Sequence, residues 1–237
     1  WGILHVRNQL SSRRVRELLN SGNEDEVERP GTTLEERASS KDVQNQFNRG
    51  FKKFCDTHKS VGAVPWFLVM GGSGSGKTFA LRHSGLEWDQ DLRELNQGIS
   101  GTKTFDWWFH SDAIFLDTAG RYVELRLNGQ EEEDSKHFDD RLEQLQLLLS
   151  NVRKKRQPCP INGMILTISS VDLQAKSEEQ LQDEANRVRR TLKLVAKTLD
   201  VHFPVIVLVT KCDRIAGFRD YFGDIEGDHA LRQQMVG

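Results

Sequence analysis

The sequence has few cysteines, no long apolar run and almost no excess of charge. Its three cysteines, Cys55, Cys159 and Cys212, lie far apart. No CxxC pair or Cys/His cluster has zinc-site spacing, and no disulfide framework is indicated, so we expect a reducing compartment, the cytosol. The 33 Lys and Arg residues nearly balance the 35 Asp and Glu residues, for a formal net charge of −2. This balance provides no general attraction to nucleic acid or to an anionic membrane.

No apolar run approaches the roughly 20 residues that a membrane-spanning helix needs. The longest run, 203–209, is interrupted by Pro204, and we find no signal peptide. The 237 residues suffice for one domain with an appendage. The chain begins at Trp1 rather than at Met, so we expect a piece of a longer protein whose membrane segments lie elsewhere.

The first 60 residues are helical in pattern. Residues 1–20 form one candidate helix, and a second is expected to begin near Thr32 or Thr33, because Thr33 and Glu36 fit a capping box. One face of this second helix carries four apolar residues at spacings of 4, 4 and 3: Val43, Phe47, Phe51 and Phe54. We predict that this face packs on the domain that follows, with a partner-binding face as the alternative.

From Pro65 onwards, short apolar runs alternate with helical patterns. Strands are expected at 66–70, 102–110, 113–117, 163–169 and 205–210, and helices around 142–152 and 181–199. Only the turn residues Ser111 and Asp112 separate the second and third strands, so these can pair antiparallel. The acidic run 131–134 is expected to be a solvated loop.

This order predicts an α/β fold, a mostly parallel sheet with helices on both faces and one antiparallel edge hairpin. We divide the chain into a helical extension, residues 1–60, and an α/β domain, residues 61–237.

The stretch "GGSGSGKT" fits the phosphate-loop pattern G-x-x-x-x-G-K-[ST], and it lies between an expected strand and an expected helix, as that loop requires. Its glycines permit close approach of the backbone to a ligand. The exposed N–H groups then surround phosphate oxygens, the lysine contacts the outer phosphates, and the threonine hydroxyl binds Mg²⁺. The predicted nucleotide-binding residues are Gly71, Gly72, Ser73, Gly74, Ser75, Gly76, Lys77 and Thr78.

Two later stretches follow expected strands. In "DTAG", Asp117 is a predicted Mg²⁺ ligand together with Thr78, and the N–H of Gly120 is placed to sense a terminal phosphate. In "TKCD", Asp213 is a predicted acceptor for guanine and Lys211 packs its stem on the base. Thr210 stands where asparagine is commoner, which removes an amide donor to the phosphate loop. The alternative is that Lys211 and Asp213 are an exposed turn pair.

Catalytic residues are harder to assign. Thr102 is the favoured switch threonine, ahead of Thr104, and a plain strand threonine is the alternative. Arg121 follows Gly120 where many GTPases have a water-orienting glutamine, and arginine cannot accept a proton from water at neutral pH. It either acts as an arginine finger in cis or pairs with the acidic run at 131–133. The candidates are Thr102, Gly120 and Arg121, and we expect slow intrinsic turnover.

Five stretches together resemble the cytoplasmic nucleotide-binding domain of the TssM/IcmF family, the inner-membrane component of bacterial type VI secretion systems. They are "PWFLVMGGSGSGKTFAL", "SGLEW", "GTKTFDWWFHSDAIFLDTAGRY", "INGMILTISSVDL" and "FPVIVLVTKCDRIAGFRDYF", spanning about residues 64–222. The resemblance implies a P-loop NTPase fold like that of small GTPases, on the cytoplasmic face of the inner membrane.

The same resemblance implies TssL- and TssJ-like membrane subunits, the tail baseplate and self-association as partners, with no nucleic acid polymer. Three hypotheses follow: a switch-like module binding Mg²⁺ with GTP or GDP rather than ATP or ADP; an active GTPase or ATPase that powers assembly or transport; and a scaffold with a vestigial nucleotide site.

Overall fold

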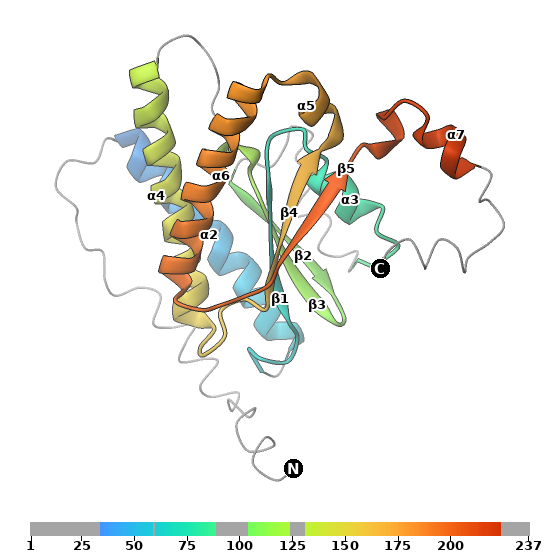
Figure 1. Cartoon of the computed structure of the whole chain (residues 1–237). Helices are drawn as coiled ribbons and strands as arrows, with labels where there is room; N and C mark the ends of the chain where they lie inside the picture. Colours follow the sequence, from blue (N-terminus) through green and yellow to red (C-terminus); the bar gives the residue numbers. More distant parts are fainter. Residues whose placement is uncertain (1–33, 59, 89–103, 124–130, 224–237) are drawn as a thin grey trace.

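The computed structural model describes residues 34–58, 60–88, 104–123 and 131–223. Figure 1 shows a sheet flanked by helices. The elements, in chain order, are α2 (Leu34–Thr57), β1 (Trp66–Gly71), α3 (Lys77–Arg82), β2 (Phe105–His110), β3 (Ala113–Thr118), η2 (Gly120–Tyr122), α4 (Glu131–Lys155), β4 (Gly163–Ser169), α5 (Ser170–Ala175), α6 (Glu178–Leu199), β5 (Val205–Thr210), η3 (Cys212–Arg214) and α7 (Phe218–Gly223).

The five strands form one mixed sheet in the order β2-β3-β1-β4-β5. Strand β1 is parallel to both β3 and β4, and β4 is parallel to β5. Strand β2 runs antiparallel to β3 at one edge, with His110 opposite Ala113 across the tight turn. The sequence-based prediction of a mostly parallel sheet with one antiparallel edge hairpin is therefore confirmed.

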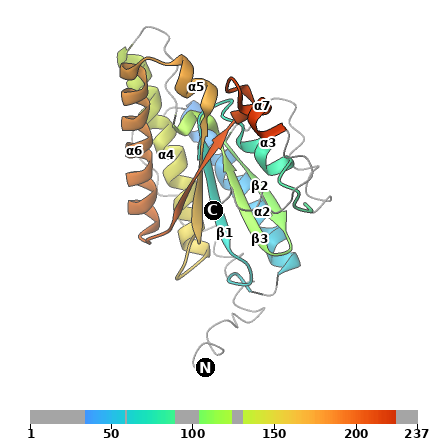
Figure 2. The ribbon, with the colours of Figure 1, turned by 45° about the vertical axis from the view of Figure 1, so that its right-hand side comes forward.

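Helices cover both faces of the sheet, but unequally. Helices α2, α4 and α6 lie on one face, and α3 lies on the other (Figure 2). Alternate residues of β1 point to opposite faces of the sheet. Trp66 and Leu68 belong to the large core under the three helices, whereas Val69 belongs to a smaller cluster with Leu81 of α3. This alternation follows from the two-residue period of a strand.

The predicted apolar face of α2 is fully used inside the chain. Val43, Phe47, Phe51 and Phe54 are all 0–1% exposed. Phe47 contacts the Trp107 ring of β2, with 5.5 Å between ring centroids. The packing prediction for this face is confirmed, and the face is not available to a partner. Whether the domain boundary lies at residue 60 stays a prediction, although α2 shares the core of the sheet.

Two local predictions were wrong or incomplete. The run 131–134 is the first turn of α4 rather than a loop, because glutamate is a good helix former and acidic residues favour helix N-termini. Helix α5 was not predicted; the Ser169 side chain caps it by accepting from the N–H of Asp172. The expected helix 1–20 and the Thr33 cap lie outside the described residues.

Candidate functional site

The loop between β1 and α3 has the backbone that its glycines predict. Gly74 (φ 70°) and Gly76 (φ 91°) are in the left-handed region, where other residues are strained. Ser75, between them, is buried, and its hydroxyl shares a 2.7 Å hydrogen bond with the Thr167 hydroxyl at the end of β4. The loop is therefore anchored to the neighbouring strand.

Lys77 is buried, with 7% of its surface exposed. Its Nζ donates to the carbonyl oxygens of Gly71 and Gly72, at 2.8 and 2.9 Å. A buried ammonium needs such acceptors, because desolvation without hydrogen bonds is costly. The predicted phosphate-contacting lysine thus bonds to its own loop in this structure.

Asp117, at the end of β3, faces the first turn of α3. Its Oδ2 accepts a 2.7 Å hydrogen bond from the Thr78 hydroxyl. The carboxylate is 0% exposed, and its Oδ1 has no hydrogen-bond partner. Burial is the main cause that raises the pKa of Asp117 from 3.8 to about 6, against the lowering effects of Thr78 and Lys77. The structure therefore brings the two predicted Mg²⁺ ligands into direct contact.

Gly120 packs closely on the glycine-rich loop. A Cβ added at Gly120 would lie 2.2 Å from the backbone nitrogen of Ser73, so a side chain does not fit there. This contact joins the segment after β3 to the loop after β1. The position predicted to sense a terminal phosphate is thus adjacent to the predicted phosphate loop.

Arg121 points to α4. Its Nη2 donates a 2.7 Å hydrogen bond to Gln144 Oε1, and its guanidinium lies over the Tyr122 ring, 5.5 Å from the centroid. The side chains of 131–133, the partners suggested by the sequence, lie outside the described residues. The structure therefore adds Gln144 as a partner that the sequence did not indicate.

Thr210 forms a hydrogen bond to the glycine-rich loop, a link that the sequence analysis expected to be absent. Its hydroxyl donates to the backbone carbonyl of Ser75, inside the glycine-rich loop. The expectation that threonine loses the link to this loop is wrong, because a short hydroxyl reaches the carbonyl directly. Gly76 also adjoins Thr210, since a Cβ there would lie 3.5 Å from its side chain, an ordinary van der Waals contact.

Strand β5 ends at Thr210, and a 3-10 helix, η3, begins at Cys212. Lys211 has a left-handed backbone (φ 56°), and its carbonyl accepts a 2.8 Å hydrogen bond from the Ser170 hydroxyl. The Asp213 carboxylate lies 3.1 Å from Arg219 of α7 and 3.7 Å from Arg214. Asp213 is half exposed and thus accessible, but it has cationic neighbours that the sequence pattern did not reveal.

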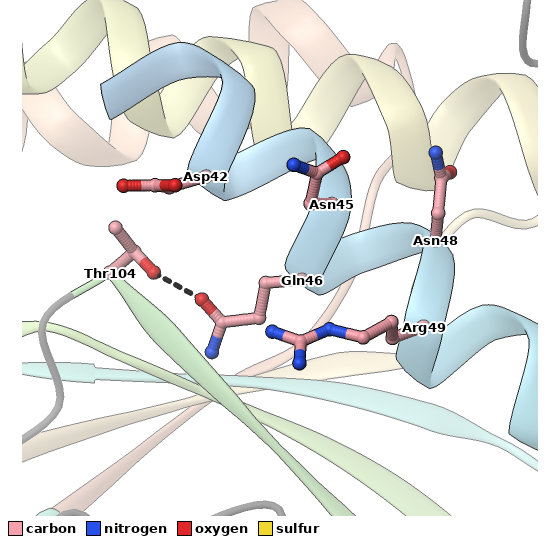
Figure 3. A pocket seen from close by; sticks show the side chains of 6 residues that line it. All are labelled: Asp42, Asn45, Gln46, Asn48, Arg49 and Thr104. Atoms are coloured by element: carbon pink, nitrogen blue, oxygen red, sulfur yellow. Dashed lines mark hydrogen bonds between the residues drawn. The ribbon is translucent and has the colours of Figure 1, made fainter. Parts of the chain in front are cut away.

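Of the two candidate switch threonines, Thr102 lies outside the described residues. Thr104 is buried, and its hydroxyl donates to Gln46 Oε1 of α2. This contact borders a polar pocket of about 620 Å³ between α2 and the start of β2, shown in Figure 3. The residues that line it are Asp42, Asn45, Gln46, Asn48, Arg49 and Thr104. Apart from Thr104, the less favoured switch threonine, none of them was assigned to the predicted nucleotide site.

Comparisons with known proteins agree on one family. A model of the IcmF-related N-terminal domain matches residues 139–237. The type VI secretion system component TssM1 of Pseudomonas aeruginosa is 35% identical over 179 residues, which cover 73% of this chain and 15% of that protein. The chain thus spans about 15% of the length of this relative.

A search of solved structures found a fold likeness too weak to support an argument. The small COPII coat GTPase SAR1 of Encephalitozoon cuniculi, in complex with GDP, is 10% identical, with a TM-score of 0.26, and the match covers 81% of this chain and 91% of that one.

Proposed function

Because the chain belongs to the TssM/IcmF family of type VI secretion components, we propose that residues 61–237 form its nucleotide-binding module, with a P-loop fold of the small-GTPase kind. The observation that carries this proposal is the buried, unpaired Oδ1 of Asp117 beside Thr78. A buried carboxylate oxygen without a partner is costly unless a ligand satisfies it. The glycine-rich loop is hydrogen-bonded to Thr210 at the carboxyl end of β5, directly before residues 211–213.

The donor set fits Mg²⁺ with a nucleotide. Mg²⁺ prefers oxygen ligands and usually takes one or two from the protein, the rest from phosphates and water. Thr78 and Asp117 supply such oxygens, and Lys77 and the loop N–H groups supply positive partners for the phosphates. Bound Mg²⁺ would neutralise phosphate charge. The chain's own residues would bind and orient the nucleotide.

Guanine preference rests on Asp213. An ionised carboxylate accepts from the ring N–H and amino group of guanine, and adenine presents no such pair of donors. The contact of Asp213 with Arg219 involves side chains that are 49% and 75% exposed. Such a pair contributes at most about 1 kcal/mol, so guanine can displace it.

We expect Asp213→Asn to lower GTP affinity by about 10- to 100-fold, since a charged recognition pair contributes about 1.5–3 kcal/mol. ATP affinity should change little. Titration calorimetry with GTP, GDP and ATP in Mg²⁺ measures both, and Asp220→Asn on α7 is the matched control. Wild-type protein that binds ATP as tightly as GTP would remove the guanine assignment and favour adenine.

Turnover is expected to be well below the roughly 10 s⁻¹ of a typical enzyme. Arg121, held against Gln144 and Tyr122, is turned to α4 and cannot serve as a base. Arg121→Ala should therefore leave the single-turnover rate within about twofold of wild type. A drop of about 10³-fold would instead identify Arg121 as an arginine finger in cis.

These measurements separate the three hypotheses. Tight binding with slow turnover supports a switch-like module. Fast hydrolysis by the isolated wild-type protein would favour an NTPase that powers assembly or transport. Absence of binding to GTP, GDP and ATP would favour a scaffold with a vestigial site. The uninterrupted loop residues 71–78 and the unpaired oxygen of Asp117 argue against the third hypothesis. Arg121, in place of a water-orienting glutamine, favours the first over the second.

The setting is proposed from the family. We place this module at the cytoplasmic face of the bacterial inner membrane, in contact with TssL- and TssJ-like subunits, the tail baseplate and further copies of itself. Within residues 34–58, 60–88, 104–123 and 131–223, no helix is long and apolar enough to cross a membrane.

A further inference from the structure

Phe79 of α3 is a large apolar side chain that the core of the protein does not use. It is 66% exposed, although it directly follows Lys77 and Thr78, which are assigned to the phosphate and metal sites. Leu81, the other large apolar residue of this helix, is 6% exposed and belongs to the cluster between α3 and the sheet, from which Phe79 is absent. Packing of the core therefore does not account for the position of this ring.

The ring of Phe79 has one covered face and one open face. His83, at the end of α3, stacks on it with 3.9 Å between the ring centroids and 24° between the ring planes. The His83 Nδ1–H donates a 2.9 Å hydrogen bond to the Phe79 carbonyl oxygen, which holds the imidazole in this place. The exposed area of Phe79 thus lies on the opposite face and the edge of its ring. A flat apolar face of this kind suits a planar ligand.

Phe79 lies on the side of α3 that faces the end of β5. Gly76, the N-cap of α3, adjoins Thr210, the last residue of β5. Residues three apart are neighbours on one side of a helix, so Phe79 lies one turn beyond Gly76 on this side. Figure 1 and Figure 2 both place α3 beside the end of β5. The residues predicted to recognise the base, 211–213, follow directly.

We propose that the open face of Phe79 stacks on the base of the bound nucleotide, an inference that rests on the nucleotide-binding function proposed above. Every nucleobase has a π-face, so stacking on an aromatic side chain tolerates any base. Phe79 then holds one face of the base, the stem of Lys211 covers the other, and Asp213 recognises the edge. Lys211 and Asp213 are both exposed and thus accessible to a base. Phe79 contributes affinity for nucleotides in general, and Asp213 contributes the preference for guanine.

Phe79→Ala is expected to lower the affinities for GTP and for ATP by the same factor, about 10-fold or more, since loss of one base stack corresponds to about 5- to 150-fold. Phe79→Tyr keeps the ring and should bind both nucleotides within about twofold of wild type. Phe79→Leu, the matched control, is apolar without a ring and should bind like Phe79→Ala. Titration calorimetry of the whole chain in Mg²⁺ measures these affinities, with inorganic tripolyphosphate as a ligand that has no base. Tripolyphosphate should bind to wild type and to all three variants alike.

Each contrary result has a distinct meaning. If wild type binds GTP and Phe79→Ala binds it as tightly, the stacking proposal is wrong and the nucleotide site stands. If Phe79→Ala loses tripolyphosphate in parallel with GTP, the substitution disturbs the glycine-rich loop and Phe79 does not contact the base. Recovery of affinity in Phe79→Leu would show an apolar contact without stacking, and a loss confined to GTP would contradict a base-tolerant stack. Wild-type protein that binds neither GTP nor ATP overturns this proposal together with the proposed function.

Discussion

Lys77→Met is expected to lower the affinity of this protein for a nucleoside triphosphate by about 100-fold or more. Hydrogen bonds to charged groups contribute about 1.5–3 kcal/mol each, and 2.8 kcal/mol corresponds to 100-fold. Methionine keeps the buried stem and removes the ammonium. The variant also loses the bonds to Gly71 and Gly72, so its free energy of unfolding should fall by about 1–2 kcal/mol.

Calorimetry and thermal unfolding measure these two effects separately. Lys197→Met, an exposed lysine on α6, is the control for the loss of one positive charge. If Lys77→Met unfolds cooperatively and still binds GTP and ATP as wild type does, Lys77 contacts no phosphate and the phosphate-loop assignment is wrong.

Asp117→Asn is expected to act in opposite directions on the empty and the ligand-bound protein. The pKa of Asp117 is raised from 3.8 to about 6, chiefly by burial. A raised carboxyl pKa means that the folded state holds its proton more tightly than the unfolded state. The contribution of Asp117 to the free energy of unfolding is therefore fully present below pH 4 and is lost as the pH rises through about 6. The difference of about two between the pKa values of the folded and unfolded states corresponds to about 3 kcal/mol of unfolding free energy, an upper bound for Asp117.

Without ligand, Asp117→Asn should thus be more stable than wild type at pH 8, and this difference should shrink towards pH 4. The gain is smaller than 3 kcal/mol because the new amide nitrogen lacks an acceptor, which costs about 1–3 kcal/mol. With Mg²⁺ and GTP the order should reverse, since the variant offers no charged ligand to the metal.

Thermal unfolding between pH 4 and pH 8, with and without Mg²⁺ and GTP, measures both differences. Asp112→Asn, in the exposed turn between β2 and β3, is the control. If the difference from wild type does not depend on pH, Asp117 does not titrate in this range. If Mg²⁺ and GTP stabilise the variant as much as wild type, Asp117 is not a metal ligand.

Predictions from local pattern succeeded where a segment's neighbours in sequence decide its structure. The run 66–70, the glycine-rich loop and the hairpin turn at Ser111 and Asp112 were all assigned to the elements that the structure contains. Their periodicity, glycine content and turn residues act within a few positions. The prediction of a loop at the acidic run 131–134 was wrong, because acidic residues suit both a solvated loop and the start of a helix.

Predictions about partners failed where the partner is distant in sequence. Thr210 was expected to lack a link to the glycine-rich loop, yet it donates to Ser75, 135 positions away. Arg121 was assigned without Gln144, which lies 23 positions later on α4. Such contacts depend on how strands are ordered in the sheet, and no local pattern contains that order.

The sequence alone determined the succession of the five strands, the composition of the glycine-rich loop and the buried face of α2, because apolar periodicity and glycine content specify these locally. Only the tertiary structure decided that β3, β1, β4 and β5 lie side by side. That order brings Asp117 to Thr78 and Thr210 to Ser75. Within the described residues it also leaves β5 at the edge of the sheet, because strand neighbours are chosen by packing of whole faces and by the hand of the crossovers.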